Sequence, residues 1–402
     1  MAQYLSPGVY VEEVPSAIKP IAGVGTSTAA FIGVVADNVT MPAIPGQFER
    51  TASGKIKESN GQPVPLTTKL AAAGEATLLT SWDAFRTNFG DFQAGNSTLA
   101  HAVYGFFNNG GTRCWVTRLA NEPVDATAVT PALAQFEAID EIALVAVPGT
   151  QDTAVQTAVI DHCAQMEDRF AILDGQQNAA STTVAAIKGS VGNSNYAAMY
   201  YPWIQVLDPV TGQTIDAPPS GHIAGLYARV DATRGVFKAP ANELIRGAIG
   251  VSKRLSKADQ DGLNPEGINA IRVFNGSVTV WGGRTLGGDA NNEWKYISSR
   301  RFMNFLRESI DQGTQWVVLE PNTPDLWARI RRNVGAFLDL QWRAGALFGN
   351  TPAEAFYVRC DETTNPPNVR EQGMVVTEIG IAIVQPAEFV IFRVSQWTGP
   401  GQ

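Results

Sequence analysis

Three histidines are the side chains of this sequence best suited to acid–base or metal chemistry near neutral pH. They are His101, His162 and His222, and His162 lies between Asp161 and Cys163. An acid, a base and a thiol are therefore consecutive, as a nucleophile or a metal site could use them. The surrounding segment has helical periodicity, however, and adjacent residues of a helix point in different directions. We therefore expect no catalytic residue and no metal ligand here.

Common catalytic and cofactor motifs are absent from the sequence. It contains no GxxxxGK[ST] phosphate loop, no GxGxxG turn after a strand, no GxSxG nucleophile elbow and no HExxH zinc motif. We therefore expect no cofactor and no enzyme activity. Because catalytic triads are assembled in space and not in sequence, a cytoplasmic α/β hydrolase is the alternative, in which one histidine meets a serine or cysteine and a carboxylate.

Two groups of arginines are the other candidate sites. Arg300, Arg301 and Arg307 fall on one predicted helix. The second group, on a later helix, is Arg329, Arg331 and Arg332. Either group can be a solvated helix face or a docking face for an acidic protein partner. The chain carries a formal net charge of -8, so general nucleic-acid binding, which needs a clustered excess of Lys and Arg, is not expected.

Composition limits the size and the environment of the fold. The 402 residues are 45% hydrophobic, which is enough for more than one core, and length alone favours two or three domains. Cys114, Cys163 and Cys360 are far apart and lack metal-ligand spacing, as in a protein that folds in a reducing compartment. The start of the chain does not resemble a secretory signal, and the longest apolar stretch, 21–35, is too short to span a bilayer.

The middle of the chain alternates between strand and helix patterns. Apolar runs at 142–147, 170–174 and 197–206 predict strands, and helical periodicity covers 153–169 and 183–191 between them. This β-α-β-α-β order predicts right-handed crossovers and a largely parallel sheet.

The remaining elements are less regular. Residues 37–74, rich in Pro, Gly, Thr and Lys, predict a surface insertion or long loops. Asn275-Gly276 between two apolar runs predicts a hairpin. Further helices are predicted at 82–89, from 97, from 220, at 293–312 and from 323, and further strands at 30–35, 114–119, 316–319, 355–360 and 375–384.

A strand is predicted at each end of the chain. Residues 9–14 follow the Pro7-Gly8 turn and are rich in β-branched and aromatic residues, and Pro15 ends the strand. Residues 389–394 predict a strand with apolar side chains on both faces, which needs cover on both sides and partners at both edges. Either strand can be an ordinary edge of the protein's own sheet or can pair with another chain.

Six motifs follow one another along the chain with a specific order and spacing. They are Pro7-Gly-Val-Tyr-Val-Glu-Glu-Val14, Trp82-Asp-Ala-Phe-Arg86, Pro219-Ser-Gly-His-Ile-Ala-Gly225, Trp294-Lys-Tyr-Ile-Ser-Ser-Arg-Arg-Phe302, Gly345-Ala-Leu-Phe-Gly-Asn-Thr-Pro-Ala-Glu-Ala-Phe-Tyr-Val-Arg-Cys-Asp361 and Ile379-Gly-Ile-Ala-Ile-Val-Gln-Pro-Ala-Glu-Phe-Val-Ile-Phe-Arg-Val394. Together they span nearly the whole chain. In the identity and order of these motifs, the chain resembles the sheath proteins of contractile phage tails and of phage-tail-like injection particles.

The resemblance implies a structural subunit without enzyme activity. Sheath subunits polymerise as stacked hexameric rings around an inner tube, and the sheath contracts to drive the tube through a target envelope. Each subunit donates its N-terminal strand to one neighbour and its C-terminal strand to another, where both complete a sheet of the receiver's C-terminal domain. The implied fold is α/β and multidomain, with a central β-α-β-α-β region of non-catalytic subtilisin-like fold, an α+β C-terminal domain and extended donor strands.

Mapped onto this chain, the resemblance implies a role for each candidate site residue. The donated strands would contain Val9, Tyr10, Val11, Val14, Phe389, Val390, Ile391, Phe392 and Val394. The receiving sheet would contain or adjoin Phe356, Val358, Val376 and Ile379, and inner-tube docking would fall to Arg329, Arg331 and Arg332. The domains would be a donor arm at 1–20, a sheath region at 21–265 with a loop-rich insertion at about 37–76, a C-terminal sheath domain at 266–384, and a donor strand and tail at 385–402.

The implied partners and location come from the same resemblance. The subunit would bind other copies of itself, an inner tube protein, and baseplate and terminal cap proteins. It would assemble in the bacterial cytoplasm into a phage tail or a phage-tail-like particle. Nucleic acid and direct membrane insertion are not expected. Another polymer-forming tail component, such as a tube or baseplate protein, is the alternative within this class.

Overall fold

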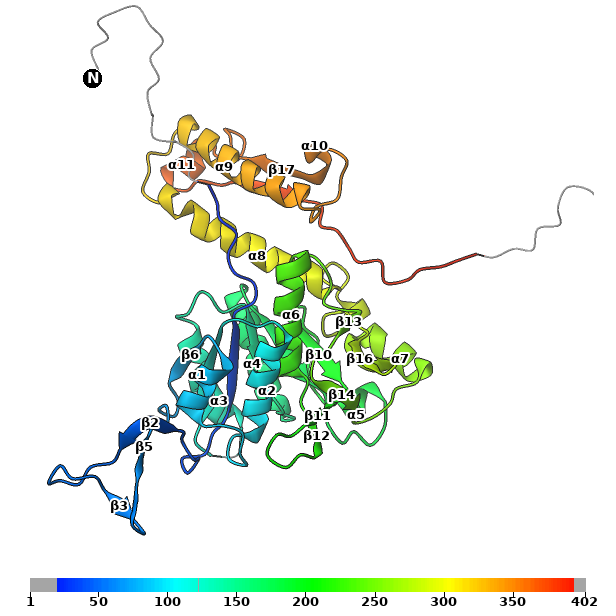
Figure 1. Ribbon diagram of the computed structural model, residues 1–402. Helices are drawn as coiled ribbons and strands as arrows, with labels where there is room; N and C mark the ends of the chain where they lie inside the picture. Colours follow the sequence, from blue (N-terminus) through cyan, green and yellow to red (C-terminus); the bar gives the residue numbers. More distant parts are fainter. Residues whose placement is uncertain (1–19, 122, 394–402) are drawn as a thin grey trace, which may run out of the picture. The chain divides into compact units, whose positions relative to one another are not determined.

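The computed structural model describes residues 20–121 and 123–393, and Figure 1 labels its helices and strands. These residues form two compact units. The larger unit comprises 24–307 with 384–393, and the smaller comprises 20–23 with 308–383. Within the described residues the chain therefore passes from one unit to the other at 23–24, at 307–308 and at 383–384.

A large sheet forms the centre of the larger unit. Among the described residues it has nine strands, in the order β13-β16-β15-β10-β9-β8-β1-β7-β6. The strands from β15 to β7 are parallel, whereas β6, β16 and β13 pair antiparallel at the two edges. The prediction of a largely parallel sheet is confirmed. The strands are β1 Ala29–Val34, β6 Ala76–Leu79, β7 Cys114–Leu119, β8 Leu144–Ala146, β9 Phe170–Asp174, β10 Ala197–Tyr201, β13 Glu243–Leu244, β15 Ile268–Phe274 and β16 Ser277–Val280.

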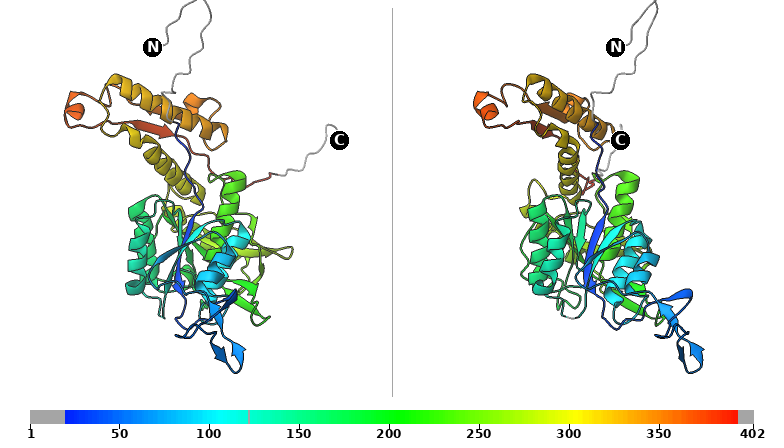
Figure 2. Two further views of the ribbon diagram at one scale, coloured as in Figure 1. Left: turned by 60° about the vertical axis from the view of Figure 1, so that its left-hand side comes forward. Right: turned by 90° about the vertical axis from the view of Figure 1, so that its left-hand side faces the viewer.

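The central strands are buried on both faces. Figure 2 shows this sheet between two layers of helices. On β1, Ala29 and Phe31 face one apolar cluster, whereas Ala30 and Ile32 face the other. Burial on both faces explains why these strands are continuous apolar runs without polar alternation. The first face is covered by α1 (Trp82–Phe89), α2 (Ser97–Asn109) and α6 (Ser220–Arg234), and the second by α3 (Ala126–Phe136) and α4 (Thr153–Met166).

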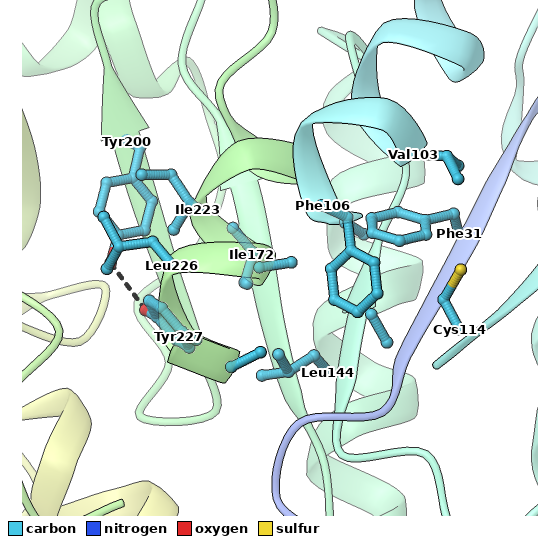
Figure 3. Packing of buried hydrophobic residues seen from close by; sticks show 14 of the residues in the cluster. Phe31, Val103, Phe106, Cys114, Leu144, Ile172, Tyr200, Ile223, Leu226 and Tyr227 are labelled. Carbon is cyan, nitrogen blue, oxygen red and sulfur yellow. Dashed lines mark hydrogen bonds between the residues drawn. The ribbon is translucent and has the colours of Figure 1, made fainter. Parts of the chain in front are cut away.

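Helices α2 and α6 pack closely on the first face (Figure 3). Gly225 of α6 lies against α2, and a Cβ at this position would overlap the Phe106 carbonyl oxygen, so only glycine permits this approach. Phe106 packs edge-to-face on Phe31 of β1, with the ring centroids 5.5 Å apart. The hydroxyls of Tyr200 and Tyr227 are hydrogen bonded at 2.7 Å, so two polar atoms inside the core are satisfied.

The strand predicted within 197–206 is present as β10, and a second strand of a different sheet follows it. β10 ends at Tyr201, and β11 (Ile204–Leu207) pairs with β12 (Thr214–Ala217) and β14 (Ala248–Val251) in a separate sheet. Pro202 separates them, because proline has no backbone N–H to donate to a ladder. The prediction of a strand within this range is confirmed by β10, whereas the second strand, β11, was not predicted. Two further helices of the larger unit are α5 (Val184–Lys188) and α7 (Lys257–Leu263).

Residues 37–75 form a mostly exposed insertion between β1 and β6. It contains short antiparallel pairs, β2 (Ala43–Phe48) with β5 (Pro65–Thr67) and β3 (Glu58–Ser59) with β4 (Gln62–Pro63). Figure 1 shows these strands projecting from the three-layered part of the larger unit. The predicted surface insertion is present, and its short strands have little apolar sequence to reveal them.

Helices and one small sheet make up the smaller unit. α8 (Ile297–Thr314) enters it, and α9 (Pro324–Arg343) follows, with its first turn capped by the Thr323 side chain. α10 (Pro352–Ala355) leads into β17 (Phe356–Arg359), and α11 (Pro367–Glu371) precedes β18 (Glu378–Ile381).

The predicted strand at 316–319 is wrong. Residues Gln315–Val317 form a 3-10 turn, and Leu319 has a φ of 66° in the left-handed region. The run connects α8 to α9, and within the described residues it has no partner strand. A short apolar run cannot be assigned to strand or helix by periodicity alone.

Candidate assembly interface

β17 and β18 form an antiparallel pair in the smaller unit. Phe356 lies opposite Ile381, and Val358 lies opposite Ile379. Among the described residues no third strand joins this sheet. A two-stranded sheet has an unpaired edge on each side, and such edges are templates for another strand.

One face of this sheet is partly buried. Phe356, Val358 and Ile379 are half-buried, and β17 packs against α9. Val376, the fourth residue expected in or beside the sheet, lies before the start of β18. Its N–H donates to the Asn365 side chain at 2.7 Å, and its carbonyl accepts from the same side chain at 3.0 Å. The structure thus brings three of these residues into one sheet and holds Val376 beside it.

The opposite face of the sheet is exposed. Tyr357 is 55% exposed, and its ring covers Gly380, its cross-strand neighbour. Arg359 and Glu378, also opposite each other, are paired at 3.4 Å. An exposed ion pair contributes little to the stability of the fold. As a cross-strand pair of opposite charges, it favours the observed register of β17 against β18.

The C-terminal segment 389–393 is extended and uncovered within this chain. It contains no helix or strand, and Phe389, Val390, Ile391 and Phe392 are 70% to 85% exposed. Consecutive exposed apolar side chains are a feature of surfaces that bind a partner. The remaining predicted donor residues, Val394 and those at 9–14, lie outside the described residues.

Glu388, directly before this segment, is a residue that the sequence did not single out. Its carboxylate is bound by the buried Arg284 side chain, with Nε at 2.7 Å and Nη2 at 2.8 Å. The two residues are 104 positions apart, so no local pattern could reveal the pair. The pair could have been predicted only if the sequence had shown that Arg284 is buried and needs a carboxylate. The burial of a charged residue cannot be inferred from composition.

The arginines of α9 do not form one patch. Arg329 pairs with Glu320 at 3.4 Å and with Asp325 at 3.3 Å. The Arg331 side chain donates to the carbonyl of Cys360, within the smaller unit. Arg332 is exposed. Of the three, Arg332 is the one whose charge the fold leaves at the surface.

Arg300 and Arg301 are buried, so the prediction that they form a positive surface is wrong. Arg301 binds both carboxylate oxygens of Asp231 on α6, at 3.0 and 2.6 Å. The Arg300 guanidinium lies over the rings of Tyr196 and Trp294, 4.6 and 4.3 Å from their centroids. These charges hold the first part of α8, which belongs to the larger unit, to the rest of that unit, because a buried charge is costly unless it is paired.

Two of the histidines are held neutral inside the larger unit. Burial lowers the pKa of His222 to about 3. Burial and the nearby charge of Arg169 lower the pKa of His162 to about 4. Buried Nδ1 of His222 has no hydrogen-bond partner in the described part of the chain. Among the residues described, no three His, Cys, Asp or Glu side chains gather as metal ligands would.

A buried serine and aspartate meet at the carboxyl end of β9. The Asp174 carboxylate accepts from the Ser220 hydroxyl at 2.7 Å, from the Ser220 N–H at 2.8 Å and from the Gly149 N–H at 2.9 Å. Burial raises the pKa of Asp174 to about 6 despite these bonds. A hydrolase would need the serine to face an imidazole. Here the serine faces a carboxylate, and the bonds tie β9 to the start of α6.

Across the part of the chain that the structure describes, no helix combines the length and the apolar composition of a membrane span.

Two family models match the sequence. The phage tail sheath protein central domain matches 122–286, and the phage tail sheath C-terminal domain matches 289–396. A putative prophage major tail sheath protein of Pseudomonas aeruginosa (strain UCBPP-PA14) is 30% identical over 287 residues, which are 69% of this chain and 71% of the relative. The tail sheath protein of Burkholderia phage BcepMu is 25% identical over 238 residues, 56% of this chain and 49% of the relative.

Solved structures match over almost the full chain. The contracted sheath of an extracellular contractile injection system, PVC, is similar with a TM-score of 0.75 and 27% identity, over 99% of both chains. The contracted helical sheath of the anti-feeding prophage gives a TM-score of 0.74 and 30% identity, over 98% of this chain and 99% of the other. A chain of the anti-feeding prophage baseplate gives a TM-score of 0.72 and 31% identity, over 98% of this chain and 100% of the other. The mixed α/β chain described above therefore belongs to the tail sheath protein family of phage tails and phage-like contractile injection systems.

Proposed function

We propose that this sheath subunit polymerises as stacked hexameric rings around an inner tube and contracts to drive the tube through a target envelope. The observation that carries the proposal is the likeness, over 98% and 99% of the chain, to subunits of two sheaths solved in the contracted state. A similar chain comes from a baseplate solved with sixfold symmetry, which supports a ring of six. The role is structural, without enzyme activity or cofactor.

Subunits are joined by donated strands. Residues 389–394 of one copy, and 9–14 of another, add to the β17–β18 sheet of a third by β-augmentation. Burying one large apolar side chain contributes about 1.5–3 kcal/mol. Ordering one residue of backbone costs about 1–2 kcal/mol. Burying the apolar side chains of 389–392 against another copy therefore offsets the free-energy cost of ordering the arm. The new main-chain hydrogen bonds stabilise the pairing further.

Each interface uses a different surface on the two copies, so the contacts are head-to-tail and propagate along a helix without closing. During contraction the arms keep neighbouring rings linked while the rings widen and shorten. The work is stored in the extended polymer at assembly, so the subunit needs no nucleotide.

The domain assignment follows the same proposal. Residues 1–20 are the N-terminal donor arm, 21–265 the sheath region and 266–384 the C-terminal sheath domain, and 385–402 the C-terminal donor strand and tail. The nine-stranded sheet with its helices, in the described residues, is the part that we assign to a non-catalytic subtilisin-like fold.

Contacts with the inner tube are proposed for α9, through Arg329, Arg331 and Arg332. Because Arg332 is exposed while the other two are engaged within the smaller unit, Arg332→Glu is the sharper test. It should weaken co-assembly with the tube protein and leave the isolated subunit folded. Unchanged co-sedimentation with tubes would rule out this docking site.

The remaining proposed partners are the baseplate and a terminal cap. Assembly takes place in the bacterial cytoplasm, and the finished sheath is part of a phage tail or a phage-tail-like particle. Likeness to a baseplate chain of the anti-feeding prophage supports the first of these contacts.

Deleting a donor arm tests the proposal. Subunits lacking residues 1–14, or lacking 389–402, should remain folded by circular dichroism but form no long tubes in negative-stain images. The full chain should form striated tubes with cogwheel cross-sections. Normal polymerisation of either truncated chain would show that its arm does not join subunits.

A further inference from the structure

The chain immediately before the exposed arm residues is fixed by one carboxylate, that of Glu388. Its two oxygens receive hydrogen bonds from Arg284 at 2.7 and 2.8 Å, from the Asn264 amide at 2.7 Å and from the Tyr296 hydroxyl at 3.0 Å. We call these four residues the Glu388 clasp. All of them belong to the larger unit.

Arg284 is positioned for this role before Glu388 is considered. Its side chain is 3% exposed, and Nη1 donates to the Asn264 carbonyl at 3.1 Å and to Asp289 at 3.0 Å. Its backbone N–H donates to the Asn269 side chain at 2.8 Å. The remaining edge of the guanidinium, formed by Nε and Nη2, therefore faces a fixed direction, and Glu388 binds this edge in the bidentate geometry that arginine favours.

The pair is charged at neutral pH. Burial acts to raise the pKa of Glu388, but hydrogen bonds from Arg284 and Asn264 outweigh it and leave the pKa below its ordinary value. Burial likewise acts to lower the pKa of Arg284, and the bonds to Glu388 reverse this. Loss of Glu388 would leave a buried guanidinium with Asp289 as its remaining described carboxylate, which is unfavourable.

The clasp marks a sharp change along the chain. Glu388 is held from several directions, whereas Phe389, the next residue, is 70% exposed, and exposure rises to 85% at Phe392. An anchored polar residue is thus followed at once by uncovered apolar ones. A segment that merely frayed from the surface would not begin at a residue bound so completely.

We propose that the Glu388 clasp anchors the root of the C-terminal arm to the larger unit of its own subunit, so that the arm leaves from a fixed point when it pairs with a second copy. This inference rests on the proposed function of the arm. A fixed root restricts the volume that the arm can explore, which lowers the entropy lost on pairing. It also passes tension on the arm to the buried Arg284 instead of to the β17–β18 sheet.

Glu388→Gln tests the inference, because glutamine keeps the shape of the side chain and removes its charge. Tyr296→Phe removes one donor and leaves the ion pair, so it provides a milder variant if Glu388→Gln folds poorly. Glu49→Gln is the matched control, since Glu49 pairs with Lys57 on the exposed insertion. Cys114, Cys163 and Cys360 are buried, so a dye attached to Ala387→Cys labels the arm root alone.

Two measurements are made on the full chain: fluorescence anisotropy of the dye in the free subunit, and the subunit concentration at which tubes form. In Glu388→Gln the anisotropy should fall, and the concentration should rise about tenfold, the factor that corresponds to about 1.4 kcal/mol. Tyr296→Phe should lower the anisotropy by less and raise the assembly concentration about twofold to threefold, and Glu49→Gln should change neither.

Either unchanged anisotropy or an unchanged assembly concentration in both clasp variants would overturn the inference. The chain lacking 389–402 is measured beside them. If it fails to form tubes while the clasp variants assemble like the full chain, the donated arm stands and the anchor is wrong. If it forms tubes normally, the arm does not join subunits, and the anchor falls with it.

Discussion

Single buried polar residues tie distant segments of the larger unit together. Asp174 joins the end of β9, the turn at Gly149 and the start of α6. Arg301 joins α8 to Asp231 of α6. Each of these groups is satisfied by partners far away in sequence. Such groups stabilise a fold mainly because leaving one of them unpaired is costly.

Asp174→Asn should destabilise the subunit. The new amide would point an N–H at the Ser220 or Gly149 donors that now bind the carboxylate. We expect a loss of about 1–3 kcal/mol, measured as a lower denaturant midpoint by fluorescence. Asp216→Asn, at an exposed position of β12, should leave the midpoint unchanged. Equal midpoints for both variants would contradict the role of Asp174.

Acid should destabilise the subunit through its buried histidines. The pKa of His162 is about 4 in the folded chain, below its ordinary 6.5, so the unfolded chain binds the extra proton first as the pH falls. This stabilisation is complete above pH 6.5 and is lost as the pH falls toward 4, by up to about 3 kcal/mol. Asp174 has a pKa raised from 3.8 to about 6 in the folded chain, so the folded chain binds this proton first. Its contribution to stability therefore increases as the pH falls from 6 to 3.8.

His162→Gln isolates the histidine contribution. The variant should lose less stability than the parent chain between pH 6.5 and 4, measured by denaturant unfolding at several pH values. Parallel curves for the two chains across that range would contradict the assignment.

At the scale of elements, the close contact of α2 with α6 depends on a missing side chain. Gly225→Ala would place a Cβ against the Phe106 carbonyl oxygen, so the helices must separate, at a cost of about 1–3 kcal/mol. Gly262→Ala on α7 meets nothing within 4 Å, and it should be neutral or stabilising by up to about 1 kcal/mol. Thermal unfolding of both variants checks this, and equal melting temperatures would contradict it.

In the proposed function, the C-terminal arm makes its contacts outside its own subunit. Phe392 is 85% exposed, so Phe392→Asp should leave the free subunit as stable as the parent but abolish tube formation. Val210→Asp, at a similarly exposed position (60%) in a loop, serves as the control and should still assemble. Light scattering and negative-stain images report assembly. Tubes formed by Phe392→Asp at the parent concentration would rule out a buried position for this side chain.

For the whole molecule, long periodic elements were predictable from the sequence. β7, β9 and α1 have the predicted bounds, and the parallel order of β8, β9 and β10 followed from alternating patterns. Repeated apolar spacing carries that information locally.

What the sequence did not reveal depends on partners remote along the chain. Arg300 and Arg301 were predicted to be surface charges. The carboxylate that binds Arg301, that of Asp231, lies 70 residues away in sequence, so no local pattern shows the pair. The Glu388 clasp was missed for the same reason. Of the candidate interface, Phe356, Val358 and Ile379 lie in one sheet. The three α9 arginines are close in sequence, but Arg329 and Arg331 bind different partners and Arg332 is exposed.

The central claim is that the arm of one copy pairs with the β17–β18 sheet of another. A photo-crosslinking residue at Ile391, in tubes grown from equal parts of isotopically heavy and light subunits, tests it most directly. Mass spectrometry should find crosslinks from 391 to peptides containing β17 or β18, with heavy–light pairs as frequent as same-isotope pairs. Crosslinks confined to same-isotope pairs, or to peptides elsewhere in the chain, would contradict strand donation between subunits.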